Sequence, residues 1–442
     1  MKKLVIFLFV LGFAVTAFAQ EVKKELPLKV GVSGIVYGTS YKAIEKDADG
    51  SYTAARIRPL FTFTDGNIEA VVKLEMDATF GQKASASGSD DTDALADKSS
   101  ENVGLGGDKK SVEIANAYVK TKVDAVAGLT LTGGIAGYDF PLVWSDNAPL
   151  ASANYSNDMV DFGIYYVKPS EGSNNKDKDD SQIYIADAKL KFGESSVRPA
   201  FFAFQCKEAA EVGQYKDSTG YIYGLSANIV LGTFGLDISG AYAKGKDKVG
   251  DAAATPVKPA TKHSGYAFDF APYIKIETIK ITPFFTMVSG DDNTTDGKDT
   301  SFINATIDGG SVAGAGINNF RLYIIEDGGS FTSNNDVATS DNNSTGKYDN
   351  TNGYLAYGLS VGGEFGAITV KLQGAYVQAP KVASGADKDM GIEFDANVGY
   401  ALTKTSTLYV EGAILKTGKY YENDGGDTQT AQYINVGMTY SI

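Results

Sequence analysis

The feature that most constrains the fold is an alternation of apolar and polar residues with period two, which recurs along nearly the whole 442-residue chain. Its last instance runs to the carboxyl terminus, where the apolar positions are Ile434, Val436, Met438, Tyr440 and Ile442. Side chains of a β-strand point alternately to its two faces, so the pattern predicts strands that each have one apolar face. A chain that ends on such a strand needs a partner for the strand's free edge.

The predicted strands are joined alternately by tight turns and by long polar segments. A strand over residues 56–64 is followed by Asp65-Gly66-Asn67, a sequence typical of hairpin turns, and the next strand returns at once over residues 68–80. A polar stretch at 81–110 comes next, and the same order repeats to the end of the chain. This segmentation predicts about eighteen strands of ~10 residues, or sixteen if a weak hairpin at 150–155 does not form, and an even number suits a closed antiparallel barrel.

The amino terminus predicts export from the cytoplasm. Lys2 and Lys3 precede an apolar run at 4–15 and a small-x-small end at Ala17-Phe18-Ala19, as in a secretory signal peptide. We therefore expect residues 1–19 to be a signal peptide, 20–27 a periplasmic segment and 28–442 the folded domain. No later stretch has the pattern of a membrane helix, so the mature chain is expected either to be soluble outside the cytoplasm or to cross a membrane as strands.

Alternation alone does not choose between these two, because apolar rows can face a core or lipid. Three further features favour a membrane barrel: the strand rhythm has no domain break, a soluble sandwich of this length would normally be divided into several domains, and aromatic residues gather toward the ends of the apolar rows. Those aromatic residues are Tyr37, Phe80, Tyr266, Tyr357, Tyr376 and Tyr440. The prediction is an all-β transmembrane antiparallel barrel of about 16–18 strands. Its short turns are periplasmic and its long loops, including 290–353, are extracellular. In that barrel the strand at 28–41 pairs with the last strand and closes the ring.

Composition excludes several other classes of function. The formal net charge of -14 argues against a nucleic-acid partner, and Cys206, as the only cysteine, cannot form an intrachain disulfide. His263 is the only histidine and is predicted to be a solvated residue at the end of a loop, so we expect no catalytic site. Acidic runs such as residues 290–299 lack the ligand spacing of a calcium loop, and glycine-rich pieces such as residues 104–107 are not followed by a helix. We therefore expect neither metal nor cofactor.

Two stretches carry a resemblance to a known family. The last strand, with Tyr440 two places before its end, resembles the closing strand of bacterial outer-membrane porins, although Ile442 stands where these usually end in Phe. Residues 56–81 (RIRPLFTFTDGNIEAVVKLEMDATFG) and 116–123 (NAYVKTKV) look like early hairpins of the general, trimer-forming porins. The resemblance implies a homotrimer in the outer membrane, in which the loop after the fifth strand folds inward toward basic residues of the early strands. By position this loop is 140–149, with Asp146 as its acid and Arg56 and Arg58 as the basic wall.

The expected function is passive diffusion of small hydrophilic solutes and ions, because a barrel of this strand number has a lumen too wide for side chains to fill. We expect the pore and its constriction to be lined by Arg56, Arg58, Lys73, Glu75, Asp77 and Asp146. Further inward charges are predicted at Lys189, Lys191, Arg198, Lys275, Lys280, Lys371, Glu69, Asp187, Asp269, Glu364, Glu393, Asp395 and Glu411. Two alternatives stay open: a surface adhesin that acts through loop 290–353, with an extra hairpin at 320–325, and a soluble extracytoplasmic binding protein.

Overall fold

The computed structural model describes residues 27–44, 46, 49–80, 109–170, 181–207, 217–247, 262–292, 297–302, 321–325, 352–422 and 428–442. The predicted signal peptide at 1–19 and nearly all of the segment at 20–27 lie outside these residues. Within them, no helix is long and apolar enough to cross a membrane.

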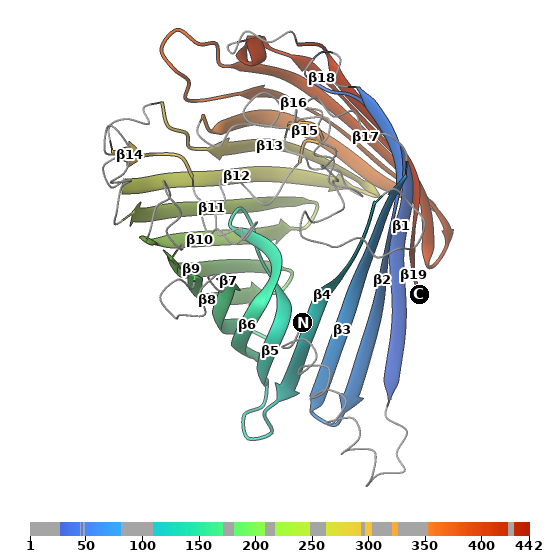
Figure 1. Ribbon diagram of the computed structural model, residues 1–442, viewed down its shortest axis with the longest axis vertical. Helices are drawn as coiled ribbons and strands as arrows, with labels where there is room; N and C mark the ends of the chain where they lie inside the picture. Colours follow the sequence, from blue (N-terminus) through green and yellow to red (C-terminus); the bar gives the residue numbers. More distant parts are fainter. Residues whose placement is uncertain are drawn as a thin grey trace.

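One sheet, antiparallel except where the short strand β14 pairs with β12, accounts for almost all of the described chain (Figure 1). Its 19 strands include the two-residue β14, and the others form the wall of a barrel. The strands are β1 (Leu28–Lys42), β2 (Gly50–Asp65), β3 (Ile68–Phe80), β4 (Lys109–Lys122), β5 (Leu129–Phe140), β6 (Trp144–Ser156), β7 (Val160–Ser170), β8 (Ser181–Phe192), β9 (Ser195–Lys207), β10 (Asp217–Leu231), β11 (Phe234–Asp247), β12 (Lys262–Ile276), β13 (Ile279–Val288), β14 (Lys298–Asp299), β15 (Tyr354–Phe365), β16 (Ile368–Gln378), β17 (Asp389–Thr403), β18 (Ser406–Thr417) and β19 (Ala431–Ser441). The weak hairpin considered at 150–155 is part of the full strand β6.

The last strand is paired on both sides. β19 lies between β18 and β1, with Val436 opposite Val410 on one side and Gly38 on the other. The ring is therefore closed as predicted, and the backbone edge of the final strand is satisfied by the first.

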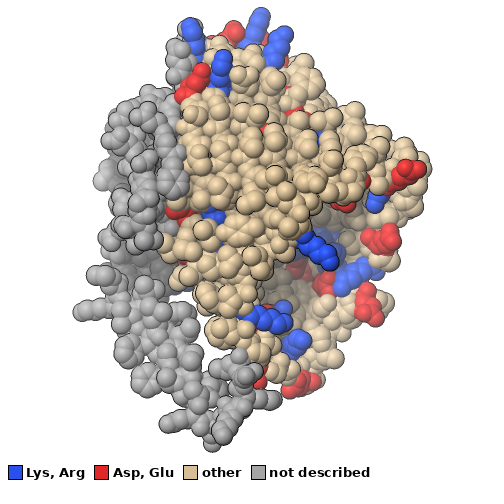
Figure 2. Space-filling view, turned by 90° about the vertical axis from the view of Figure 1, so that its right-hand side faces the viewer, with Lys and Arg blue, Asp and Glu red and all other residues tan. Residues whose placement is uncertain are grey.

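The two faces of the wall follow the alternation. On β19, Ile434 and Val436 are each 51% exposed on the outer face, whereas Tyr433 and Asn435 are 4% and 0% exposed on the inner face. Uncharged residues cover most of the described face seen in Figure 2, where charged side chains gather near its margins. One aromatic assignment was wrong: Tyr37 is 2% exposed and belongs to the inner row, together with Tyr41.

The tight turns lie at one end of the barrel, except for the turn between β5 and β6. Between β2 and β3 the turn is Gly66-Asn67, and Gly66 has φ +56, a left-handed conformation that glycine adopts without strain. The predicted reversals after β4, β6, β8, β10, β12, β15 and β17 are also short turns. At the other end lies the 3-10 helix η1 (Lys419–Glu422), between β18 and β19.

Candidate channel constriction

Two inward arginines of β2 are bound to carboxylates of β3. Arg56 donates from Nε and Nη2 to Asp77 at 2.7 and 2.9 Å, and its Nη2 also lies 2.9 Å from Glu75. Arg58 donates to the other oxygen of Glu75. Lys73, two residues before Glu75 on the same face of β3, is half-buried. The structure thus brings five of the six predicted site residues into one cluster on the barrel's inner wall.

The arginines cover the carboxylates in this cluster. The side chains of Arg56 and Arg58 are 24% and 35% exposed, whereas those of Asp77 and Glu75 are 3% and 7% exposed. Guanidinium groups therefore form the surface that faces the lumen, and the carboxylates lie beneath them. Arg56 and Arg58 are therefore more accessible than the carboxylates that they bind, and the exposed Glu113 of β4, which lies opposite Glu75, adds an acidic group beside them.

The upper halves of β5 and β6 leave the wall. β5 pairs with β4 only through residues 130–135, and β6 pairs with β7 only through residues 150–156. Above these positions the two strands pair with each other alone, up to Phe140 opposite Trp144. Figure 1 shows this hairpin curving into the barrel interior.

The tip of the hairpin is apolar and fully buried. Phe140, Leu142, Val143 and Trp144 are each 0% exposed, and Phe140 packs edge-on against Phe202 of β9. The tip is a tight turn in which Val143 N–H donates to the Phe140 carbonyl at 3.1 Å, and Leu142 has φ 66. This conformation is unfavourable for a non-glycine residue, so packing of the leucine side chain holds it there.

Arg198 of β9 fastens the hairpin to the wall. Its Nη1 donates to the carbonyl of Asp139 at 2.8 Å, and its guanidinium carbon lies 5.5 and 5.0 Å from the ring centres of Tyr138 and Phe140. Its Nε donates to Asp187 of β8 at 2.8 Å. The hairpin is thus held by a charge-assisted bond and by cation–π contacts.

The predicted loop 140–149 needs a correction. The segment does enter the lumen, but most of it is strand: Asp146 belongs to β6 and pairs with Tyr138. The arginine that contacts the hairpin is Arg198. The side chain of Asp146 lies outside the described part of the structure.

A second segment also enters the barrel. Residues 321–325 have no regular secondary structure, and Leu322, Tyr323, Ile324 and Ile325 are 0–1% exposed. The Ile324 and Ile325 N–H groups donate to the two carboxylate oxygens of Glu393 on β17, at 2.5 and 2.9 Å. Glu393 itself is 0% exposed on the inner face.

Arg321 anchors the start of this segment. It donates from Nε to Asp269 of β12 at 3.1 Å and from Nη2 to the other oxygen of the same carboxylate. Its carbonyl accepts a hydrogen bond from Gln373 of β16. Further along, Tyr323 packs against Tyr433 of β19 with ring centres 6.2 Å apart. Side chains from four strands thus hold one loop segment inside the barrel.

This placement corrects two predictions about loop 290–353. Residues 321–325 form no hairpin, and they lie against the inner wall rather than outside the barrel. The signal that could have revealed them is local: RLYII is an arginine followed by four apolar or aromatic residues within a long Gly, Ser and Asn-rich stretch. Such a run is a candidate for burial.

His263 differs from its prediction as a solvated loop residue. It belongs to β12, its side chain is 16% exposed, and its Nδ1 lies 3.1 Å from Asp299 Oδ2 on β14. The Asp299 carboxylate also accepts from the Ser301 N–H at 2.9 Å. Although burial of Asp299 acts in the opposite direction, these hydrogen bonds from His263 and Ser301 lower its pKa.

Comparison with known proteins finds matches among solved structures. No protein-family model and no curated protein sequence matches the chain. Pseudomonas aeruginosa OccK2 (OpdF) aligns with a TM-score of 0.56 and 10% identity over 94% of this chain and 98% of that one. A BenF-like porin from Pseudomonas fluorescens Pf-5 aligns with a TM-score of 0.56 and 9% identity over 94% of this chain and 98% of that one. The outer membrane protein opdK from Pseudomonas aeruginosa aligns with a TM-score of 0.53 and 9% identity over 94% of this chain and 99% of that one. The chain therefore has the closed antiparallel barrel fold of these proteins along nearly its whole described length.

Proposed function

We propose that the protein is a porin of the bacterial outer membrane, a passive channel for small hydrophilic solutes and ions. The observation that carries this proposal is the closed barrel with an apolar outer face and a polar inner wall, represented by Val436 beside Asn435. A barrel of this strand number encloses more space than side chains of its own wall fill. The fold that it shares with a BenF-like porin gives further support.

The passage is narrowed by the β5–β6 hairpin and by residues 321–325. We place the constriction between these two insertions and the guanidinium groups of Arg56 and Arg58, with Lys73, Glu75 and Asp77 beside them, and Asp146 on the hairpin. Solutes would be selected by size and by the field of the wall. No step of this transport needs a catalytic group, so the protein acts as a channel and not as an enzyme.

The alternative function, a surface adhesin that acts through loop 290–353, receives less support. The described part of that loop includes residues 321–325, whose side chains are packed inside the barrel and cannot contact a surface ligand. Assembly as a homotrimer remains a proposal from the resemblance to general porins.

Single-channel recording of the purified protein in a planar lipid bilayer tests the function. We expect stepwise, ohmic conductance and permeation of small sugars in vesicle swelling. Absence of conductance from protein that shows heat-modifiable mobility on detergent gels would overturn the channel and leave a structural barrel.

A further inference from the structure

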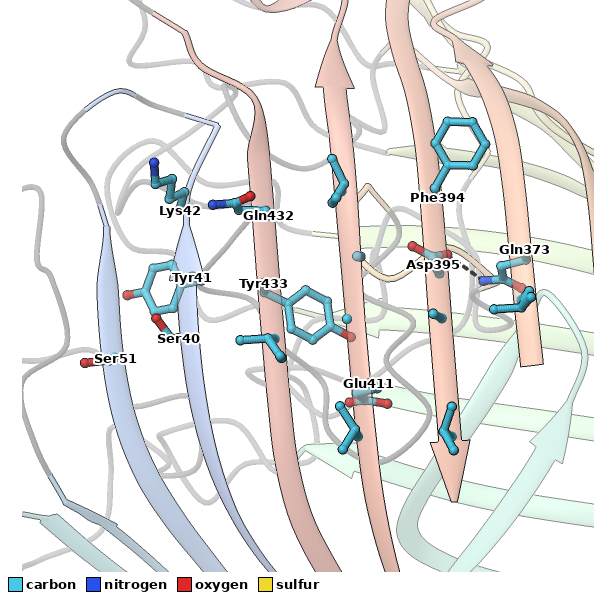
Figure 3. A pocket seen from close by; sticks show the side chains of 18 of the residues that line it. Ser40, Tyr41, Lys42, Ser51, Gln373, Phe394, Asp395, Glu411, Gln432 and Tyr433 are labelled. Atoms are coloured by element: carbon cyan, nitrogen blue, oxygen red, sulfur yellow. Dashed lines mark hydrogen bonds between the residues drawn. The ribbon is translucent and has the colours of Figure 1, made fainter. Parts of the chain in front are cut away.

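The outer wall of the barrel has a groove across β1, β2 and β16–β19. Its volume is about 1260 Å³, and the side chains that line it belong mainly to two adjacent rows of the outer face. One row consists of Ser51, Ser40, Ile434, Gly412, Ala396 and Leu372, which lie opposite one another in register on successive strands. Figure 3 looks onto this part of the wall, with Ser51, Ser40 and Lys42 at one side and Phe394 at the other.

Small side chains make the floor of the groove. Gly412 and Ala396 stand between larger apolar residues of the neighbouring rows, of which Phe394 is 63% exposed and Ile414 is 52% exposed. On the other side Val398 and Val410 complete the wall. A convex barrel surface with large side chains throughout would have no such depression, so the small residues create it.

The groove descends from the long-loop end of the barrel toward the middle of the wall. Counted from that end, Ser51 is the second residue of its strand, Ser40 the third, Ile434 the fourth, Gly412 the sixth and Ala396 the eighth. The path is oblique because strands of a membrane barrel are tilted, which inclines every cross-strand row.

The chemistry of the lining changes along this path. At the shallow end the groove has Ser40, Ser51, Gln432 and Lys42, whereas its deep end is lined only by apolar or small side chains on the outer face. Lys416 extends the outer row of Ile414 by one further position toward the same end and is exposed. Three carboxylates are among the lining residues: Asp49 accepts a hydrogen bond from Gln429 at 2.9 Å, whereas Asp395 and Glu411 belong to the inner face of the wall and are 4% and 1% exposed.

We propose that this groove binds lipid A, the phosphorylated and acylated anchor of the outer leaflet, an inference that rests on the proposed membrane location. Acyl chains fill the floor over Gly412 and Ala396, and a headgroup phosphate lies at Lys42 and Lys416. A lipid matches the groove because it too is polar at the leaflet surface and apolar below it. The lining changes from cationic to apolar along the groove's length. Binding of a second copy of the chain would not require this change.

Two pairs of variants test the proposal by native mass spectrometry of full-length mature protein from mixed vesicles of lipid A and phosphatidylcholine. Ala396→Phe fills the floor, and its control Ala227→Phe places the same ring on the outer face of β10. Lys42→Gln with Lys416→Gln removes both cations, and its control is Lys244→Gln with Lys246→Gln on the outer face of β11. Each lysine near a membrane surface is expected to account for about a fivefold change in binding.

The expected result is retained lipid A in the parent and both controls, about 25-fold weaker retention without Lys42 and Lys416, and displacement by Ala396→Phe. Equal retention in all variants, or equal retention of phosphatidylcholine, overturns the proposal. Loss of an oligomer from Ala396→Phe without loss of lipid assigns the groove to a second copy and also overturns it. Conductance is recorded separately, so failure of the channel and failure of the lipid site are distinguishable.

Discussion

The contact between Glu393 and residues 321–325 leads to a quantitative prediction about gating. Glu393 accepts two backbone hydrogen bonds through two different carboxylate oxygens. Glu393→Gln keeps the size of the side chain but replaces one acceptor oxygen by an NH₂ group, which faces an N–H donor. A buried N–H that is left without an acceptor costs about 1–3 kcal/mol, and the variant leaves at least one such N–H.

This cost shifts the balance between the docked and released segment by roughly 5- to 150-fold. A segment that is released about 0.1% of the time in the parent would then be released roughly 0.5 to 13% of the time. We expect single-channel records of Glu393→Gln to show frequent excursions to a higher conductance, since the released segment widens the passage.

The matched control is Glu411→Gln on β18. Glu411 is also a buried inward carboxylate at 1% exposure, and it accepts hydrogen bonds from Asn397 and Asn435 at 3.2 Å. Each variant replaces one buried inward carboxyl group by an amide of the same size, but only the first acts on residues 324 and 325. Identical records from Glu393→Gln and Glu411→Gln, or records equal to the parent, would refute the role of Glu393 as the residue that positions the segment.

Three further predictions follow from the wall and the long loop. Replacing both Arg56 and Arg58 by serine uncovers the carboxylates beneath them, so the reversal potential in a salt gradient should shift toward cations, and less so at 1 M salt, where the Debye length is ~3 Å; an unchanged potential at low salt removes these arginines from the constriction. Val436→Arg on the outer face should reduce folding stability in lipid vesicles by roughly 2 to 4 kcal/mol if it lies near the midplane; the inward Thr439→Arg should be milder, and equal damage would mean that the faces are misassigned. Because its folded pKa is lowered, Asp299 stabilises the contact between β14 and β12 above the ordinary aspartate pKa, and this is lost as pH falls through the lowered value; the protection factors of the amides of residues 297–301, corrected for the intrinsic pH dependence of exchange, should fall there, and a pH-independent protection factor would contradict it.

The structure also changed the design of one of these experiments. By alternation alone, Asn435 is an inward residue at which arginine should be tolerated. Asn435 is indeed inward, but it is 0% exposed and donates to Glu411 at 3.2 Å, so an arginine there would have no space. Alternation indicates the face of a residue and not how full that face is, which is why Thr439 is the better control.

Some of the site could be read from local sequence. The Gly66-Asn67 turn sets the register of β2 against β3, and that register places Arg56 opposite Asp77. The cluster of arginines and carboxylates is therefore a consequence of one hairpin, and every member was predicted. The Asp187–Arg198 pair likewise joins β8 and β9 across a short turn.

The interior insertions could not be derived in the same way. Arg321 reaches Asp269 across 52 positions of sequence, and Ile324 reaches Glu393 across 69. No turn or alternation connects such residues, and the backbone at 321–325 is irregular. The hairpin of β5 and β6 was expected to enter the lumen only from a family resemblance, and its contact with Arg198 depends on which wall its apolar face meets.

The sequence by itself determined the strands, their inner and outer faces and the closure of the ring. These depend on local rules, because a period-two pattern assigns each face and a tight turn sets each register. Only the tertiary structure decided which segments occupy the lumen, which carboxylates hold them and where small side chains leave a groove on the outer wall. Those features arise from packing between residues that are distant in the chain. The free energy of these packing contacts depends on the shape of the whole barrel rather than on any local pattern.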